Sequence, residues 1–331
     1  MGNSEEKKKP FVGPVEKLID CISGAIGKAY EPKHLKKLAE ARSYEINTIS
    51  EVMRENGDIP ISYDNNGIQL DTRKSDDLFM RAKNRLAFQE LKKQENIEKV
   101  AGKAAALLDG EKEVPNTPMD SDWTIRFFNS VEDVSSEEMQ NLWARVLAGE
   151  VKQPGSFALR TLETLHNMTK SEAEVFNEIC HHVLITDGKM IIFNDNAMMK
   201  TRGILYGYII QMEECGLMNS DNQVAVTSTI DNSLRMIARN DSMILFGRTK
   251  TDTITEIKMP AYILTIAGSE LARIIGVSTP DEELMSVARE IQKRNPQVYV
   301  SAHKINSIEA GGEINYCMTD QITGRNISGD I

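Results

Sequence analysis

Both tryptophans of the chain lie between Asp120 and Met168, a stretch in which apolar positions follow a helical pattern. After the run Ser135-Ser136-Glu137-Glu138, which has the spelling of a helix capping box, apolar residues recur at the three-and-four spacing of one helical face. They are Met139, Leu142, Trp143, Val146 and Leu147. Gly149 predicts the end of this helix, and Pro154-Gly155-Ser156 predicts the turn into a second one. Because aromatic side chains bury large apolar areas, this stretch is expected to be the packing centre.

Before this centre the pattern predicts helices. An apolar stripe on a short helix is formed by Val15, Leu18, Ile19, Ile22 and Ile26. Such a stripe packs on its own chain or on a second copy, or, beside lysines, lies on an anionic membrane surface. A helix from Pro32 to about Asn56 and another from Ser75 to about Asp109 predict a helical hairpin or bundle. The segment 58–72 between them predicts a loop or a short β-hairpin.

After Met168 short helices and strands alternate. Thr169-x-x-Glu172 and Ser171-x-x-Glu174 are overlapping capping boxes that open a helix, and a strand is expected over 189–193. A helix follows over 201–215, then β-rich runs over 224–230, 234–238, 243–246 and 253–264, and a helix capped by Thr265. This order is typical of a winged-helix unit. One more helix, 280–294, and two strands, 298–305 and 313–318, end the pattern.

These elements predict a mainly α protein with four parts. They are a helical hairpin or bundle that drives self-association (1–115), a tryptophan-centred helical core (116–168), an α+β winged-helix-like module (169–276), and a terminal helix with a β-hairpin (277–331).

Charge and composition narrow the class of partner. The chain has 331 residues, of which 40% are apolar and 27% charged, as in soluble globular proteins. Residues 1–115 hold 20 Lys and Arg against 20 Asp and Glu, so the remainder holds 19 against 29. This acidic remainder disfavours nucleic acid, whose binding depends largely on phosphate neutralisation. Four widely spaced cysteines, no apolar run of 18 residues and no signal peptide predict a cytoplasmic protein.

The phrase MQNLWARVLAGEVKQPGSFALRTLETL, residues 139–165, resembles the bacterial family catalogued as domain of unknown function 2806. Members of that family carry an LWA-x-x-LAGE block followed by PGSF and RTL. The likeness continues to Leu264-Thr265-x-x-Gly268-x-x-Leu271 and covers 120–276. A more distant resemblance is to the abortive-infection alpha family, which has a helical N-terminal part, an LWA-x-LLA helix and a terminal LT-x-x-G phrase. That resemblance implies a role in bacterial defence against phage.

Candidate chemistry is sparse. Paired acids such as Glu137, Glu138 and Glu150 are able to support acid–base catalysis, but the first two occupy a helix's first turn, where capping is the favoured interpretation. Cys180-His181-His182 is a cluster of metal-capable side chains. Adjacent helical residues point about 100° apart, so a zinc site would also need His166, Cys215 or His303. We therefore expect no catalytic residue, no metal and no cofactor.

The remaining candidates are structural or interaction residues. A core is expected from Trp123, Phe127, Trp143 and Leu147, with Arg145 and Arg160 from the matching phrase. Each arginine is expected to tie Glu150 or Glu163 to a neighbouring helix or, alternatively, to anchor a phosphate or nucleotide. Candidate DNA contacts are Arg202, Arg248, Lys250 and Lys258.

The sequence thus favours a non-enzymatic interaction protein of anti-phage defence, a homo-oligomer that meets a protein partner from host or phage. One alternative is a winged-helix DNA-binding regulator. A second is a membrane-surface effector that uses the stripe from Val15 to Ile26 at the inner membrane.

Overall fold

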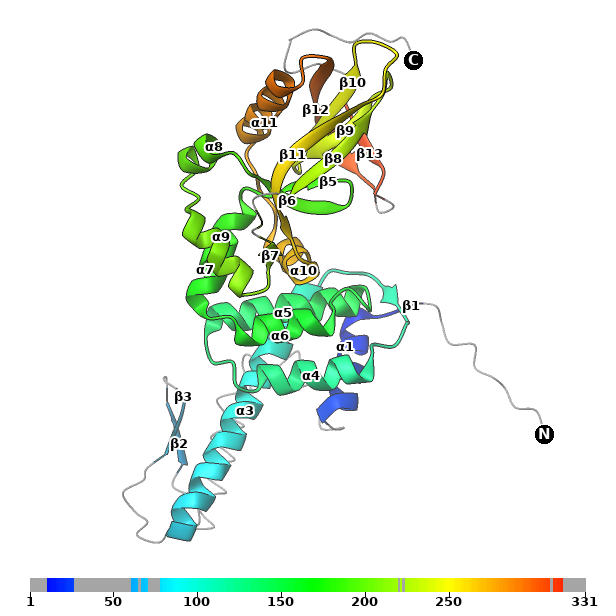
Figure 1. Ribbon diagram of the computed structural model, residues 1–331. Coiled ribbons are helices and arrows are strands. Elements are labelled where there is room, and N and C mark those ends of the chain that lie inside the picture. Colours follow the sequence, from blue (N-terminus) through cyan, green and yellow to red (C-terminus); the bar gives the residue numbers. More distant parts are fainter. Residues whose placement is uncertain are drawn as a thin grey trace, which may run out of the picture. The chain divides into compact units, whose positions relative to one another are not determined.

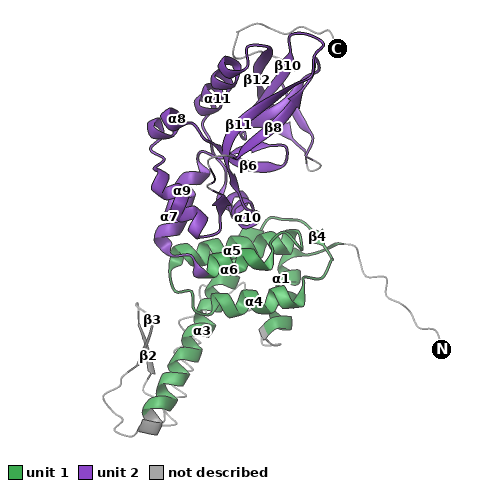
Figure 2. Ribbon diagram, in the orientation of Figure 1, with its two compact units in different colours: residues 1–166 green, residues 167–331 purple. Residues whose placement is uncertain are grey.

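The computed structural model describes residues 11–26, 61–64, 67–70, 78–219, 221, 224–309 and 312–317 (Figure 1). The chain divides into two compact units, residues 1–166 and 167–331 (Figure 2). The helix predicted from Pro32 to Asn56 lies outside the described residues. The finer division into four parts stays a prediction.

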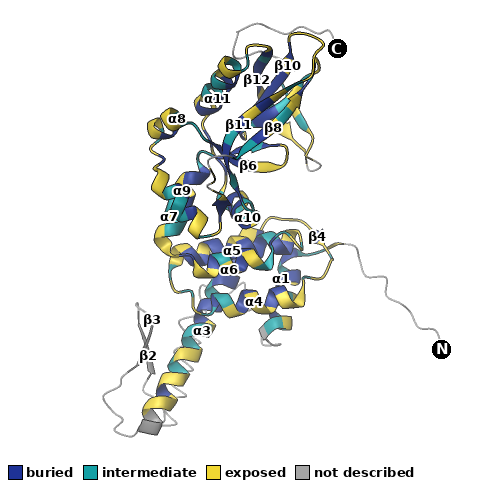
Figure 3. Ribbon diagram, viewed as in Figure 1, coloured by how far each residue is buried: buried dark blue, intermediate teal, exposed yellow. Residues whose placement is uncertain are grey.

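Unit 1 is built mainly from helices. They are α1 (Pro14–Ile26), α3 (Leu78–Leu108), α4 (Ser121–Val131), α5 (Glu137–Lys152) and α6 (Leu159–Asn167). Two strand pairs accompany them, β1 (Phe11–Val12) with β4 (Val114–Pro115) and β2 (Ile61–Asp64) with β3 (Gly67–Leu70). The long helix predicted up to Asp109 and the two central helices are confirmed, and the segment 58–72 contains a hairpin. Burial along α3 increases towards its C-terminal end, where Val100, Ala104 and Leu108 are fully buried (Figure 3).

The central helix α5 differs from its predicted ends. The predicted capping box begins at Ser135, but the N-cap of the helix is Ser136, one residue later. The Ser136 hydroxyl accepts a hydrogen bond from the Met139 amide at 3.5 Å. The helix does not end at Gly149 but continues to Lys152. A Cβ at Gly149 would lie 2.8 Å from Cε2 of Phe157, so this glycine makes room for an aromatic ring instead of ending the helix.

Unit 2 combines helices with many strands. The helices are α7 (Lys170–Cys180), α8 (Asn196–Thr201), α9 (Tyr206–Glu214), α10 (Ile266–Ile275) and α11 (Asp281–Arg294). The strands are β5 (Leu184–Thr186), β6 (Lys189–Phe193), β7 (Met218–Asn219), β8 (Ala225–Ile230), β9 (Arg235–Arg239), β10 (Met243–Thr249), β11 (Thr255–Leu264), β12 (Val298–Ile308) and β13 (Ile314–Tyr316).

These strands form one antiparallel sheet in the order β13-β12-β10-β9-β5-β6-β11-β7, with β8 also paired to β11. Strand β11 serves two parts of the sheet. Its residues Thr255–Pro260 pair with β8, whereas Ala261–Leu264 pair with β6 and β7. The end of β11 therefore lies between β6 and β7 in a three-stranded arrangement.

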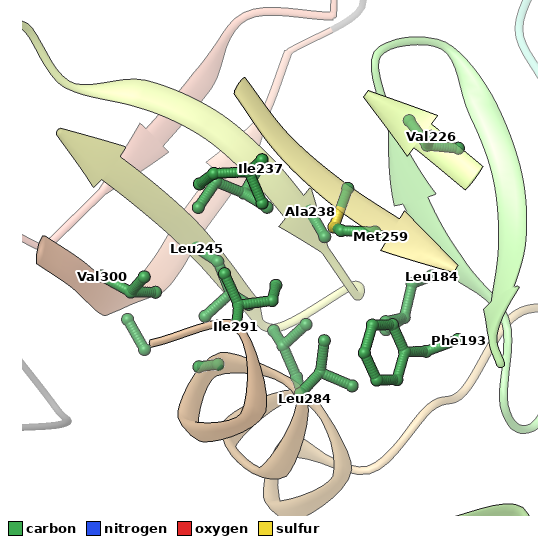
Figure 4. Close-up of a cluster of buried hydrophobic side chains, with 14 of the residues drawn as sticks. Leu184, Phe193, Val226, Ile237, Ala238, Leu245, Met259, Leu284, Ile291 and Val300 are labelled. Carbon is green, nitrogen blue, oxygen red and sulfur yellow. The ribbon is translucent and has the colours of Figure 1, made fainter. Parts of the chain in front are cut away.

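The hydrophobic core of unit 2 lies where α11 packs against the sheet. Along β12 the residues Val298, Val300 and Ala302 are buried in this core at alternate positions, as expected for one face of a strand. Figure 4 shows Leu284 and Ile291 of α11 among the side chains of the sheet.

The prediction of a mainly α protein is wrong, because the second unit has a nine-stranded sheet and the fold is mixed α/β. The described residues form ten helices beside this sheet. The short β-rich runs after residue 224 join the strands near the C-terminal end in one sheet, a long-range pairing that local patterns do not reveal. The helix predicted over 201–215 begins later than expected, as α9 at Tyr206, because a separate helix, α8, ends at Thr201 and Gly203, at φ +74°, lies between the two.

The phrase Leu264-Thr265-x-x-Gly268 has a packing explanation. Thr265 caps α10, as predicted, by accepting from the Gly268 amide at 3.1 Å, and its own amide donates to the Leu217 carbonyl at 2.9 Å. A Cβ at Gly268 would lie only 2.0 Å from that carbonyl oxygen. Only glycine allows the helix to approach the backbone so closely.

Candidate functional site

The tryptophan-centred core is an aromatic cluster inside unit 1. Trp123, Phe127 and Trp143 are at most 3% exposed. The ring of Phe127 stacks on Trp123 at 5.2 Å between centroids and meets Trp143 edge-on at 5.3 Å. Such pairs contribute about 0.5–1.5 kcal/mol each beyond the area they bury. Leu147, one turn after Trp143 on α5, is also fully buried.

The LAGE and PGSF phrases meet at one buried carboxylate. Glu150 is 1% exposed, and its two oxygens accept hydrogen bonds from the backbone amides of Gly155 at 2.6 Å and Phe157 at 3.1 Å. Glu150 therefore holds the turn between α5 and α6. Arg145 and Arg160 lie exposed on these two helices, and Glu163 pairs with Arg126 at 3.7 Å.

The first-turn acids of α5 contact neighbouring side chains. Glu138 accepts a hydrogen bond from the Ser136 hydroxyl at 2.8 Å, and Glu137 pairs with Lys103 at 3.3 Å while its side chain stays 79% exposed. Negative charge in this turn stabilises the helix by opposing its dipole.

The apolar stripe of α1 packs inside unit 1. Leu18 and Ile22 are fully buried and Ile19 is 8% exposed, whereas Val15 is half-buried. The side chain of Ile26 lies outside the described residues. Because α1 contacts α3, α4 and α5, the stripe is not presented to a membrane or to a second copy in this structure.

A cavity of about 330 Å³ lies beside α1 and the start of α4. Lys17 lines it and donates from Nζ to the Pro115 carbonyl at 2.7 Å. Burial lowers the pKa of Lys17, against the charge of Glu150. Burial also raises the pKa of Cys21 to about 11, so this thiol is a poor nucleophile at neutral pH.

The four candidate DNA contacts lie in different environments. Arg202 is not on the surface, since its side chain is 9% exposed and its Nη1 lies 2.8 Å from Oε1 of Glu283. Arg248 is exposed on β10 and lies over the ring of Tyr299, with its guanidinium carbon 5.5 Å from the ring centroid. Lys250 is exposed and donates to a backbone carbonyl, and Lys258 is exposed on β11. Arg202 is therefore buried against Glu283, whereas the other three candidates are exposed.

The cluster at the end of α7 points in three directions. Cys180 is fully buried, which raises its pKa to about 12. His181 hydrogen-bonds Ser278 through Nδ1, and His182 hydrogen-bonds Oε2 of Glu283 at 2.8 Å through Nδ1. No group of three or more His, Cys, Asp or Glu side chains within the described part of the chain is arranged to hold a metal ion.

Glu283 thus joins residues that sequence reasoning left apart. Its carboxylate, 6% exposed, meets Arg202 with one oxygen and His182 with the other. Burial lowers the pKa of Arg202, while the charge of Glu283 raises it. The three residues come from α11, the end of α8 and the segment after α7. Since about a hundred residues separate His182 from Glu283, no local pattern in the sequence marks the pair.

The start of α9 presents apolar side chains to solvent. Leu205 is 59% exposed and Tyr206 is 53% exposed, and the carboxylates of Glu213 and Glu214 at the other end of the helix are also exposed. The exposed face of α9 therefore combines apolar and acidic character.

Comparison with known protein families gives a match that is longer than the resemblance seen over residues 120–276. A family model described as "Protein of unknown function (DUF2806)" matches residues 80–287, more than half of the chain. No curated protein and no solved structure matches the chain. No link to abortive-infection proteins is shown. Among the helices that the structure describes, none is long and apolar enough to cross a membrane. By the extent of the match, the chain belongs to the DUF2806 family.

Proposed function

We propose that this protein is a non-enzymatic interaction protein that acts as an oligomer with a protein partner in bacterial anti-phage defence. The apolar start of α9 carries the proposal for a protein partner. The defence role is supported by the resemblance of the LWA helix and the LT-x-x-G phrase to abortive-infection alpha proteins.

The order of elements in unit 2 supports a winged-helix-like module. Strands β6, β11 and β7 lie side by side, α7 precedes them, α8 and α9 connect β6 to β7, and α10 follows β11. In such a module the helix before the second strand is the one that reads DNA, and the wing is the connection between the last two strands. Here that helix is α9, and the connection contains β8, β9 and β10.

The surface of α9 favours protein over DNA. Glu213 and Glu214 would repel phosphates, and a DNA-reading helix gains affinity from cations. Leu205 and Tyr206 instead offer apolar area that is removed from water when a protein covers it. Aromatic residues such as Tyr206 are enriched at the centres of such interfaces.

The test uses Leu205→Ser. Leu205 occupies the N-cap of α9 without a side-chain cap, so serine removes the exposed apolar side chain and adds a preferred capping group. Ile254→Ser is the matched control, because Ile254 is 74% exposed in the same unit but lies outside α9. We expect phage plating to drop with the intact gene and with the Ile254→Ser form, and to recover with Leu205→Ser.

Plating that is unchanged by the intact gene across a broad phage panel would contradict the defence role. Protection that survives Leu205→Ser would contradict the α9 surface. The oligomer is tested separately by measuring the mass of the full chain in solution.

A DNA-binding regulator remains a second candidate, favoured by the exposed cations Arg248, Lys250 and Lys258. It predicts duplex binding by the full chain that weakens steeply with salt and is lost when Arg248 and Lys250 are both changed to alanine.

A further inference from the structure

Unit 2 contains a cavity of about 480 Å³, and the ion pair of Arg202 and Glu283 forms part of its wall. Both side chains are at most 9% exposed. Nη1 of Arg202 lies 2.8 Å from Oε1 of Glu283, but the two atoms are not aligned as a hydrogen bond. These two atoms and Nη2 of Arg202 are buried and have no hydrogen-bond partner among the described residues. Buried polar atoms are nearly always hydrogen-bonded, so three unsatisfied atoms at one cavity require an explanation.

The charges of this pair argue against an ionic ligand. Arg202 and Glu283 neutralise each other, so neither charge is left unmatched for a free anion or cation. Glu282 adds a carboxylate to the wall that repels an anion, but it is exposed and attracts a cation only weakly. What the pair lacks is hydrogen bonds, and it lacks them on both sides, because a guanidinium only donates and a carboxylate only accepts.

Two hydroxyl groups add acceptors to the same wall. Thr201 donates its proton to the carbonyl of Ala197 at 2.9 Å, and Ser286 donates to the carbonyl of Glu282 at 2.8 Å. Each is a bond back to the preceding turn of its own helix. A hydroxyl has one proton and two lone pairs, so these two groups can accept a hydrogen bond from a ligand.

A primary carboxamide is a neutral group that matches these donors and acceptors. Its oxygen has two lone pairs, for Nη1 and Nη2 of Arg202, and its nitrogen carries two hydrogens. One hydrogen is for Oε1 of Glu283, and the other is for the hydroxyl of Thr201 or Ser286. The remaining wall offers apolar surface for an alkyl chain, and it is formed by Ala197, Met198 and Pro280.

We propose that this cavity binds a ligand that ends in a primary carboxamide, held by Arg202 and Glu283. His182 contacts Oε2 of Glu283 at 2.8 Å, so Oε1 is the oxygen that remains for the ligand. The inference goes beyond the proposed function, because it requires neither a protein partner nor the surface of α9. The amide belongs either to a glutamine or asparagine side chain of another protein or to a free small molecule.

The test titrates the full chain, labelled with ¹³C in its methionine methyl groups, with butyramide, butyrate and n-butylammonium, and follows the methyl signals by NMR. Met198 lines the cavity, and Met198→Leu assigns its signal. We expect butyramide to shift the Met198 signal saturably and to bind roughly tenfold or more tightly than either ion, while Met139 in unit 1 stays unmoved. N,N-dimethylbutyramide keeps the acceptor but has no N–H, so it should bind roughly tenfold or more weakly than butyramide.

A variant tests the donor side of the site. Arg202→Lys keeps the positive charge but replaces the planar fork with a single ammonium, so butyramide should bind roughly tenfold or more weakly. The matched control is Arg248→Lys, which makes the same change at an exposed arginine of β10 outside the cavity and should leave the affinity unchanged. An unchanged affinity in Arg202→Lys would overturn the site. If that variant does not fold, the comparison of butyramide with N,N-dimethylbutyramide on the intact chain decides.

A Met198 signal that does not move with butyramide, or that moves equally with butyrate, n-butylammonium or N,N-dimethylbutyramide, would also overturn the site. A capped Gly-Gln-Gly peptide is compared with butyramide to identify the source of the amide. A peptide that binds at least as tightly as butyramide supports a protein side chain, and a peptide that does not bind where butyramide does supports a free small molecule. Because no partner protein and no α9 variant is involved, failure here is distinct from failure of the proposed function.

Discussion

Glu150→Gln tests whether the phrase shared with the family is held together by one carboxylate. Each oxygen of Glu150 accepts from a backbone amide, that of Gly155 at 2.6 Å and that of Phe157 at 3.1 Å. Glutamine keeps one acceptor, and its NH₂ group faces the other amide, so one buried N–H loses its partner. Hydrogen bonds to charged groups contribute about 1.5–3 kcal/mol, and we expect a loss of about 2–3 kcal/mol.

The assay is denaturant unfolding followed by tryptophan fluorescence. Both tryptophans, Trp123 and Trp143, are buried in unit 1, so the signal reports the unit that contains Glu150. The matched control is Glu137→Gln on the same helix, whose side chain is 79% exposed in a 3.3 Å pair with Lys103. An exposed pair of this kind contributes little, and we expect a change within about 0.5 kcal/mol.

The two variants must differ for the reasoning to hold. Equal midpoints for Glu150→Gln and Glu137→Gln, with unchanged slopes, would mean that the two amide contacts do not stabilise the turn between α5 and α6. A changed slope would instead indicate a change in the surface exposed on unfolding. In that case thermal unfolding of the same variants decides, with an expected decrease in Tm of about 5–10 °C for Glu150→Gln.

Three further predictions follow. Gly268→Ala should destabilise unit 2 by about 1–3 kcal/mol, because the added carbon meets a backbone carbonyl. Gly207→Ala is the control, since open space surrounds the added carbon, and it should leave stability unchanged. Equal rates of amide hydrogen exchange in the two variants would refute the close approach. The backbone amide of Thr169, at the start of α7, lowers the pKa of Glu172 by donating a hydrogen bond to its carboxylate. The stability that this carboxylate contributes is therefore complete above pH 4.5 and is lost as pH falls through the lower folded-state pKa. The difference in stability between the intact chain and Glu172→Ala should accordingly shrink in acid. Iodoacetamide should label exposed Cys317 before buried Cys180, whose pKa is about 12, as peptide mass mapping would show; the reverse order would contradict the burial.

Helices and strands could be predicted wherever apolar residues recur in the sequence at the spacing of one face of the element. The spacing from Met139 to Leu147 predicted α5, and the capping box of Thr169 and Glu172 is present at α7. The ends were less predictable, because a glycine is ambiguous without its neighbours. Gly149 looked like a helix stop, and the ring of Phe157, eight residues away, explains why a glycine lies inside the helix.

The sheet and the polar cluster depend on contacts that a local pattern does not contain. Strand β10 pairs with β12 between residues such as Leu245 and Ala302, across more than fifty residues that include two helices. Likewise, Glu283 meets Arg202 and His182 only after folding. From the sequence, His182 was considered only as part of a metal-capable cluster and Arg202 only as a DNA contact, because nothing in the first turn of α11 marks Glu283 as the buried carboxylate that both residues meet.

The sequence phrases that identify the family are explained by packing, so membership in the family does not by itself indicate what the protein binds. Gly149 leaves room for the ring of Phe157, Glu150 holds the turn after α5, and Gly268 lets α10 approach the carbonyl of Leu217. A chain that keeps these residues keeps those contacts, whatever it binds. The proposed partner surface depends instead on Leu205 at the start of α9, a position where serine would suit the helix at least as well. A polar residue at Leu205 should therefore leave the fold intact and abolish the interaction, so loss of phage protection without loss of stability is the outcome that assigns a function to this surface.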